Sequence, residues 1–162
     1  MAEFLSGVGY EVIGHDPFIE ESAVPGRLGS LAETLAADVV TLHAPGRPDG
    51  SPLIGPEEIA RMREGSLIVN TSRGSLIDTA ALVDGLERGC PAMAALDVYE
   101  TEPPDVSAFG AVLDKVILTP HMAWYSEESE RDMRTKAAQE AARILRGEAP
   151  LNVVASPEER TR

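Results

Sequence analysis

The sequence holds few of the residues that build disulfide frameworks or bind nucleic acid. One cysteine in 162 residues excludes an internal disulfide and supplies no cysteine cluster for a metal ion. Basic residues are also scarce, because 14 Lys and Arg stand against 27 Asp and Glu. The resulting net charge of −13 would repel phosphate over most of the surface. We therefore expect neither a disulfide scaffold, nor a metal site, nor a direct nucleic-acid partner.

Long apolar runs are missing as well. No stretch approaches the ~20 apolar residues of a membrane span, and the N-terminus lacks the basic and apolar regions of a secretory signal. These features predict a cytoplasmic protein with no membrane partner. At 162 residues the chain is long enough for one domain with a packed core.

Short apolar runs are present instead, and they alternate with amphipathic stretches. The runs are continuously apolar rather than alternating, which predicts strands buried on both faces. They occupy residues 10–14, 37–43, 65–71, 92–99 and 115–119. Segments of helical period separate them. Repeated β–α units of this kind predict an α/β fold, a Rossmann-like parallel sheet with flanking helices.

The helical segments carry end signals. In residues 78–89, Asp78 stands where an N-cap belongs and Gly89 stands where the helix should stop. Ser126 caps a predicted long C-terminal helix over residues 126–147, with glutamates in its first turn and arginines in its last. The residues that follow are polar and contain proline, which is typical of a frayed tail.

The expected opening of a dinucleotide-binding fold is absent. Such a fold begins with a strand, a G-x-G-x-x-G turn and a helix, whereas residues 1–9 look like the end of that helix. We therefore expect a partial dinucleotide-binding domain over residues 1–150 that lacks its first strand and glycine-rich turn. A polar tail over residues 151–162 follows it. The sequence looks like an N-terminally truncated chain.

Polar side chains follow several predicted strands. Asp16 ends the first strand, where a carboxylate can hydrogen-bond an adenosine ribose; read alone, Asp-Pro is more simply a turn pair. Arg73 comes just past another strand and precedes Gly74, which permits a close backbone approach. Its guanidinium can grip a carboxylate in bidentate fashion or form a surface ion pair.

Three further acidic residues, Asp97, Glu100 and Glu102, follow the next strand, and His121 follows the strand beyond it. Read alone, the segment around His121 fits packing and turn chemistry. Chance seldom supplies an arginine, a carboxylate and a histidine at successive strand ends of one sheet. A carboxylate bonded to an imidazole fixes its tautomer and makes it an acid–base group at neutral pH.

The chain resembles the NAD-binding domain of the D-isomer-specific 2-hydroxyacid dehydrogenases. The residues that carry the resemblance are VIGHDPF, LHAP, LIVNTSRGSLIDTAALVDGLERG, AALDVYETEPP and ILTPHMAWYSEES. They are ordered and spaced as in that family and cover most of residues 5–150. PHMAWYSEES and MRTKAAQEAARI are most similar to the C-terminal binding protein branch, with a tryptophan three residues past the histidine.

The resemblance implies NAD-dependent hydride transfer between nicotinamide and a small 2-oxoacid or 2-hydroxyacid. Arg73 would hold the substrate's carboxylate and keto oxygen, and His121 would give a proton to the carbonyl oxygen. Glu102, 29 residues after Arg73, would orient and charge His121. Glu100 is the competing carboxylate, but Glu102 has the family's spacing.

The resemblance also implies contacts with the cofactor, NAD. Asp16 would bind the adenosine ribose, Asp97 would sit near the nicotinamide carboxamide, and Trp124 would form a wall of the substrate pocket. The remaining cofactor contacts would come from Ala44, Pro45, Gly46, Arg47, Pro48, Asp49, Gly50, Thr71, Ser72, Arg73, His121 and Trp124.

Two parts of the family's pattern have no counterpart in the sequence, namely the glycine-rich pyrophosphate turn and the substrate domain. The resemblance places the missing strand between the strands at 10–14 and 37–43 on one side and the strand at 65–71 on the other. Two alternatives to an enzyme therefore stay open, an NAD(H)-responsive binding protein of the corepressor kind and an inactive fragment. We expect a homodimer.

Overall fold

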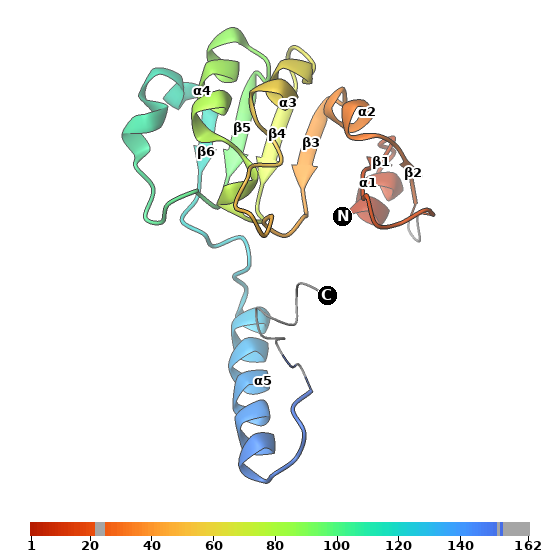
Figure 1. Cartoon of the computed structure of the whole chain (residues 1–162), viewed down its shortest axis with the longest axis vertical. Helices are drawn as coiled ribbons and strands as arrows, with labels where there is room; N and C mark the ends of the chain where they lie inside the picture. Colours follow the sequence, from red (N-terminus) through yellow and green to blue (C-terminus); the bar gives the residue numbers. More distant parts are fainter. Residues whose placement is uncertain (22–24, 152, 154–162) are drawn as a thin grey trace. The chain divides into compact units, whose positions relative to one another are not determined.

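The chain forms two compact units, Met1–Ala123 and Trp124–Arg162. Figure 1 shows the computed structural model, which describes residues 1–21, 25–151 and 153. The first unit carries every β-strand of the described residues. The second unit carries the long helix α5 (Glu127–Leu145).

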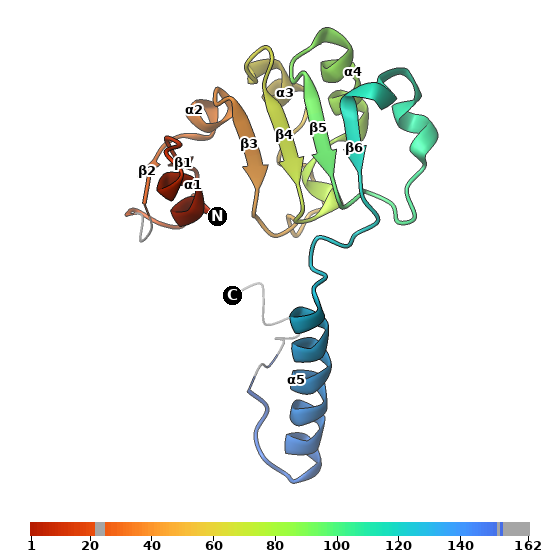
Figure 2. The same ribbon diagram turned by 180° about the vertical axis from the view of Figure 1, so that it is seen from behind.

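A four-stranded parallel sheet lies at the centre of the first unit, in the order β3-β4-β5-β6. Its strands are β3 (Val39–Leu42), β4 (Leu67–Asn70), β5 (Met93–Leu96) and β6 (Val116–Leu118). The register aligns their last residues, Leu42, Asn70, Leu96 and Leu118. All four strands therefore end at one edge of the sheet, here named the carboxyl edge, and the loops that follow them leave from it (Figure 2).

The helices between these strands lie over one face of the sheet (Figures 1 and 2). Between the strands these are α3 (Pro56–Arg61), α4 (Thr79–Arg88) and the 3₁₀ segment η2 (Val106–Lys115), while α2 (Leu31–Leu35) precedes β3. Side chains from these elements and from the strands form one hydrophobic core, in which Ile59, Ile68 and Leu86 are fully buried. This arrangement confirms the predicted α/β class and parallel sheet.

Burial of the strands on both faces, predicted from the continuous apolar runs, is wrong for the first unit. Val39, Met93 and Ile117 are 50%, 45% and 57% exposed, and they alternate with more deeply buried neighbours. The reason is that the helices described between the strands cover a single face of the sheet. Figure 2 shows the opposite face. The long helix α5 belongs to the second unit.

The predicted helix ends are confirmed. The Asp78 side chain accepts a hydrogen bond from the Ala81 backbone N–H at the start of α4, and Gly89 ends that helix with φ of 77°. A residue with a Cβ is strained in that left-handed conformation, so glycine suits the position. Ser126 caps α5 by accepting from the Ser129 backbone N–H.

The N-terminal region forms a separate sheet. Its helix α1 (Ala2–Gly7) precedes β1 (Ile13–Gly14), which pairs in parallel with β2 (Arg27–Leu28). Because β3 pairs directly with β4, the expectation of a missing strand between residues 37–43 and 65–71 is wrong. In the described residues, the outer sides of β3 and β6 are the two edges of the four-stranded sheet.

Most of the predicted polar tail, residues 151–162, lies outside the described residues, so the tail and the domain limits stay predictions. Within the described part of the chain, no helix combines the length and the apolar character needed to cross a membrane.

Candidate active site

The loop after β4 holds Arg73 at the carboxyl edge. Asn70, the buried last residue of β4, donates from Nδ2 to the Arg73 carbonyl (2.8 Å) and accepts from the Ser72 N–H (3.1 Å). The Ser72 hydroxyl donates to the carbonyl of Leu42 at the end of β3 (2.7 Å). The Arg73 backbone is therefore fixed to two strands, while its side chain is exposed and donates to the Ser72 carbonyl.

Gly74 brings the loop after β4 against the loop after β5. A Cβ at Gly74 would lie 1.8 Å from the carbonyl carbon of Tyr99 and 2.5 Å from the backbone nitrogen of Glu100. No side chain fits in that space. The close approach predicted for Gly74 is thus made to the chain's own backbone, and it fixes the two loops relative to each other.

Asp97 follows β5 directly and is 3% exposed. Its Oδ1 accepts from the Thr119 hydroxyl (2.5 Å) and the Met122 N–H (2.9 Å), and its Oδ2 accepts from the Ala123 N–H (2.8 Å). Burial by itself would raise the pKa of Asp97, but these hydrogen bonds outweigh it and hold the pKa below its ordinary value. The carboxylate thus organises the loop that follows β6.

His121 lies in that loop and contacts Glu102. The distance between His121 Nδ1 and Glu102 Oε2 is 2.8 Å, and the side chains are 47% and 40% exposed. Glu102 also accepts from the Tyr99 N–H through Oε1 (3.2 Å). The hydrogen bonds to His121 and to the Tyr99 amide lower the pKa of Glu102. Glu102 is therefore ionised at neutral pH and is an acceptor for the imidazole.

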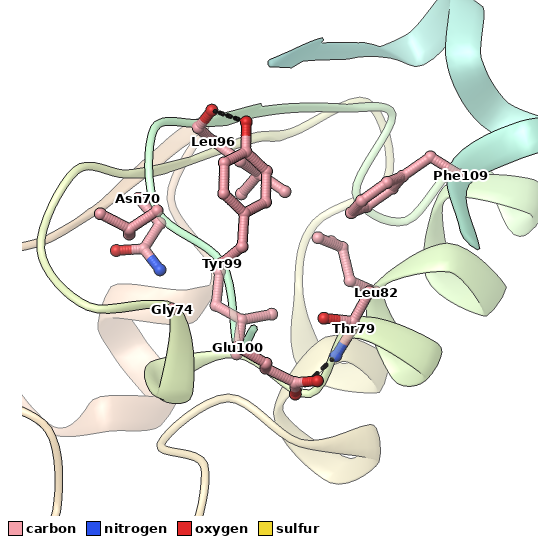
Figure 3. A pocket seen from close by; sticks show the side chains of 10 residues that line it. Asn70, Gly74, Thr79, Leu82, Leu96, Tyr99, Glu100 and Phe109 are labelled. Carbon is pink, nitrogen blue, oxygen red and sulfur yellow. Dashed lines mark hydrogen bonds between the residues drawn. The ribbon is translucent and has the colours of Figure 1, made fainter. Parts of the chain in front are cut away.

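The competing carboxylate is engaged elsewhere. Glu100 Oε1 accepts from the Thr79 N–H at the start of α4 (3.2 Å), as Figure 3 shows. A carboxylate at that position satisfies an otherwise unpaired helix donor. Among the two candidates, the structure brings Glu102 to His121.

His121 has an unusual backbone conformation for a residue with a side chain, with φ of 51°. Such left-handed residues outside glycine cost on the order of 1–3 kcal/mol and persist only where the surrounding contacts impose them. The contacts that flank His121 are the hydrogen bonds from Met122 and Ala123 to Asp97. Its own N–H donates to the Thr119 carbonyl (3.1 Å).

The residues predicted to contact the cofactor are more exposed. Asp16 follows β1, is exposed, and accepts only a local hydrogen bond from the Phe18 N–H among its described contacts (2.8 Å). In the loop at residues 44–50, Arg47 donates to the Pro52 carbonyl (2.9 Å) and Asp49 accepts from the Ser51 N–H (3.0 Å). These two side chains therefore bond to the backbone of the residues that directly follow the loop.

Trp124 belongs to the second unit, so its place is described within that unit. Its ring stands edge-on to the ring of Tyr125, with centroids 5.6 Å apart and planes at 83°. The side chain is 49% exposed. Its role as a wall of the substrate pocket stays a prediction.

Two hollows lie beside the carboxyl edge, and neither is lined by Arg73, Glu102 or His121. The smaller, of about 10 Å³, lies among Asn70, Tyr99 and core side chains (Figure 3) and has room for about one water. The larger, of about 460 Å³, lies between the start of α4 and the segment from Tyr99 to Phe109. The predicted catalytic side chains are exposed to solvent in the first unit.

Three residues that fix the loops of the site by hydrogen bonds were not predicted from the sequence. Asn70 fixes the Arg73 loop, Thr119 donates to Asp97, and the Tyr99 hydroxyl lies 2.8 Å from the Thr119 carbonyl. For Asn70 a signal was present, because a polar residue that ends a buried apolar run needs partners. For Tyr99 and Thr119 there was none, since their partners lie about 20 residues away and one is a backbone carbonyl.

Known proteins match the chain over most of its length. Residues 1–123 match the family described as "D-isomer specific 2-hydroxyacid dehydrogenase, NAD binding domain". The chain is 39% identical over 154 residues to a D-3-phosphoglycerate dehydrogenase of Methanocaldococcus jannaschii, covering 92% of this chain and 29% of the relative. It is 36% identical over 162 residues to a D-lactate dehydrogenase of Treponema pallidum, covering 91% and 49%.

A solved structure agrees with these matches. The crystal structure of TP0037 from Treponema pallidum, a D-lactate dehydrogenase, superposes with a TM-score of 0.85 at 34% identity. The match covers 96% of this chain and 51% of that one. The chain thus spans about half the length of the D-lactate dehydrogenase or less than a third of the longer relative. With a matching family over residues 1–123 and the same parallel fold, the chain belongs to the D-isomer specific 2-hydroxyacid dehydrogenase family, in its NAD-binding domain.

Proposed function

We propose that this chain carries the NAD-binding half of a D-2-hydroxyacid dehydrogenase, with Arg73, Glu102 and His121 as its catalytic side chains. The observation that carries the proposal is the Glu102–His121 contact of 2.8 Å at the carboxyl edge. Ligands of parallel α/β sheets bind at this edge. Arg73 stands at the end of a strand of the same sheet.

The proposed chemistry divides between the nicotinamide and the protein. When bound, NADH would supply the hydride that reduces the keto carbon of a 2-oxoacid, and NAD⁺ would accept a hydride in the reverse direction. Arg73 binds the substrate carboxylate and polarises the keto oxygen. His121 donates a proton to that oxygen, so that a hydroxyl forms. Because Glu102 engages Nδ1, the nitrogen assigned to the substrate is Nε2.

Glu102 has two tasks in this proposal. Its lowered pKa keeps it ionised at neutral pH, so its charge stabilises the imidazolium from which the proton comes. Its hydrogen bond also fixes the ring orientation. The second bond of the carboxylate, from the Tyr99 N–H, keeps Glu102 itself in place.

The residues present fit part of an NAD molecule. Asp16 offers an exposed carboxylate at the end of β1, suited to ribose hydroxyls, and the strand-end loops at residues 44–50 and 71–73 stand at the same kind of edge. No G-x-G-x-x-G turn occurs in the 162 residues. The described fit therefore covers the ribose and the strand-end loops and does not include backbone donors of such a turn for the pyrophosphate.

The proposed substrate is a small 2-oxoacid or its D-2-hydroxyacid. Two relatives are named for D-lactate and D-3-phosphoglycerate, and both compounds are acids of this class. Trp124 is proposed to face the substrate side chain, and an indole there suits an apolar or thioether group. We also propose that the protein forms a homodimer and that it is most similar to the C-terminal binding protein branch of the family.

A second candidate function is an NAD(H)-responsive binding protein without turnover. It is favoured by one observation, the exposure of the Arg73, Glu102 and His121 side chains to solvent. Calorimetric titration with NADH and an assay of NADH oxidation with pyruvate, glyoxylate and hydroxypyruvate separate the candidates. Binding without turnover in a protein completed to the length of the relatives would support the sensor and contradict the enzyme.

A further inference from the structure

The geometry points to Tyr99 as a positioning residue that fixes the position of the Glu102 carboxylate relative to the His121 imidazole. Its consequence for catalysis rests on the proposed function, but the contacts are properties of the folded chain. Tyr99 lies in the loop after β5, between the strand and Glu102. It uses its backbone for one partner of the pair and its side chain for the other.

The backbone contact is with Glu102. The Tyr99 N–H donates to Glu102 Oε1 (3.2 Å), while Glu102 Oε2 contacts His121 Nδ1. One oxygen of this carboxylate thus binds the Tyr99 backbone and the other binds the imidazole. Gly74 lies so close to the Tyr99 carbonyl that this part of the backbone has little freedom to shift.

The side-chain contact is with the loop that carries His121. The Tyr99 hydroxyl donates to the carbonyl of Thr119 (2.8 Å), with the Leu96 carbonyl 3.1 Å away (Figure 3 draws the latter contact). The same Thr119 carbonyl accepts the N–H of His121 (3.1 Å). The Tyr99 hydroxyl and the His121 amide therefore meet on one oxygen.

The ring that carries this hydroxyl is itself well anchored. Figure 3 shows Tyr99 beside a small hollow of about 10 Å³ that Leu82 and Phe109 also line. Burial, together with the nearby charge of Asp97, raises the pKa of Tyr99, so the hydroxyl keeps its proton and stays a donor. A phenylalanine would keep the ring packing and lose only the donor.

Tyr99 and Asp97 hold different parts of the same loop. Asp97 accepts from Thr119, Met122 and Ala123, which shapes the turn around the left-handed His121. No hydrogen bond between Asp97 and Glu102 is described, so Asp97 acts on the His121 side of the pair through hydrogen bonds and on Glu102 only through charge. Tyr99 bonds both to Glu102 and to the loop that carries His121. A change of 1 Å in the distance between Glu102 and His121 matters for proton transfer.

The test compares Tyr99→Phe with Tyr10→Phe, which removes the same atom from a tyrosine that is 63% exposed. Nitrogen NMR of ¹⁵N-labelled imidazole, at a pH where the ring is neutral, gives the ratio of the Nδ1–H to the Nε2–H tautomer of His121. Glu102 favours Nδ1–H by accepting from it. We expect Tyr99→Phe to lower that ratio by about 3- to 10-fold, the effect of one hydrogen bond, and Tyr10→Phe to leave it unchanged.

A second readout separates positioning from loss of stability. Amide hydrogen exchange at His121 should become about 3- to 10-fold faster in Tyr99→Phe relative to the amides of β4. An equal acceleration at β4, or loss of the fold, would show that Tyr99 merely stabilises the domain and would overturn the proposal. An unchanged tautomer ratio in Tyr99→Phe would overturn it as well.

The outcome does not depend on catalysis. Both readouts are taken on the 162-residue chain without cofactor or substrate. Absent turnover in a protein completed to the length of the relatives would therefore contradict the proposed function and leave the positioning role standing. Glu102→Gln is the reference variant, because it should change the tautomer ratio at least as much as Tyr99→Phe. If Glu102→Gln left the ratio unchanged, Glu102 and His121 would not be paired in solution and the role of Tyr99 would fall with the pair.

Discussion

The carboxyl edge of β4–β6 and the end of β1 each present an aspartate that the family resemblance assigns to the cofactor, but the two are held very differently. Asp97 is 3% exposed and accepts from a hydroxyl and two backbone amides of another loop. Asp16 is exposed and accepts from an amide two residues away. The first is bound into the fold, and the second is attached only to its own turn.

The contrast indicates which parts of the proposed site are assembled by the chain itself. Around Asp97, the loops after β4, β5 and β6 are joined by close backbone packing and by the hydrogen bonds of a buried carboxylate, and the Glu102–His121 pair lies between two of these loops. Around Asp16, β1 and β2 have two residues each and lie outside the four-stranded sheet. The half proposed for proton transfer is thus held by contacts between several loops, and the half proposed for ribose binding is held mainly by local contacts.

The largest expected effect breaks the packing on which the half proposed for proton transfer depends. In Gly74→Ala, the new Cβ would fall 1.8 Å from the Tyr99 carbonyl carbon, so the loops after β4 and β5 must move apart. We expect a loss of about 3 kcal/mol in the free energy of unfolding, the upper end of the usual cost of overpacking. Urea denaturation followed by circular dichroism measures it.

Gly110→Ala is the matched control, because a Cβ at Gly110 meets no atom within 4 Å. Its unfolding free energy should stay within about 0.5 kcal/mol of the parent chain. Equal stability of the two variants would show that the loops after β4 and β5 are not pressed together in solution.

The next effect compares the two aspartates directly. Asp97→Asn keeps the shape of the side chain but removes the charge and places an NH₂ where an acceptor is needed, so we expect a loss of about 2 kcal/mol. Asp16→Asn keeps its local acceptor and should change the unfolding free energy by less than about 0.5 kcal/mol. A cost for Asp16→Asn as large as that for Asp97→Asn would remove the contrast between the regions.

The dependence on pH sharpens the same comparison. The pKa of Asp97 is lowered in the folded chain, so its contribution to stability is present above the unfolded value of about 3.9 and is lost as the pH falls through the folded value. The stability difference between the parent chain and Asp97→Asn should therefore be constant from about pH 7 to about pH 5 and shrink below about pH 4. A difference that grew in acid would mean that the folded pKa is raised.

Cofactor preference tests the exposed aspartate. A carboxylate at the ribose position would repel a 2′-phosphate, so binding should favour NADH over NADPH by at least about tenfold. Asp16→Ala should narrow that preference without changing stability. Calorimetric titration gives both affinities, and tighter binding of NADPH than of NADH by the parent protein would remove Asp16 from the ribose site.

The smallest effect concerns Trp124 in the second unit. In a protein completed to the length of the relatives, Trp124→Ala should raise KM for bulky 2-oxoacids more than for pyruvate, because an indole wall mainly contacts the larger side chains. Steady-state kinetics with both substrates measures the difference. Equal increases would indicate that Trp124 stabilises the structure and does not contact the substrate.

The sequence was informative where local chemistry decides the structure. The cap at Asp78, the stop at Gly89 and the cap at Ser126 depend on the residue itself and on its immediate neighbours, and all three are found. The adjacency of Glu102 and His121 was also predictable, since residues that follow parallel strands meet at one edge.

Other features depend on contacts that a sequence does not display. An apolar run shows that a strand is hydrophobic, but it does not show whether helices cover one face or two, and Val39 and Ile117 proved half-exposed. The segment η2 was missed because it is 3₁₀ helix with a kink at Val112 rather than a regular amphipathic helix. The Tyr99 hydroxyl bonds a backbone carbonyl, which every residue possesses.

The central claim is that His121, paired with Glu102, is the proton donor of a dehydrogenase. Its most direct test is a chimera in which this chain replaces the matching half of the Treponema pallidum D-lactate dehydrogenase, assayed by kcat/KM for pyruvate with NADH. The isolated chain should be near background, because Arg73, Glu102 and His121 are exposed to water in the described structure. The chimera should turn over, and its His121→Gln variant should lose about 10²- to 10⁴-fold. Turnover that survives His121→Gln, or strong turnover by the isolated 162-residue chain, would contradict the account.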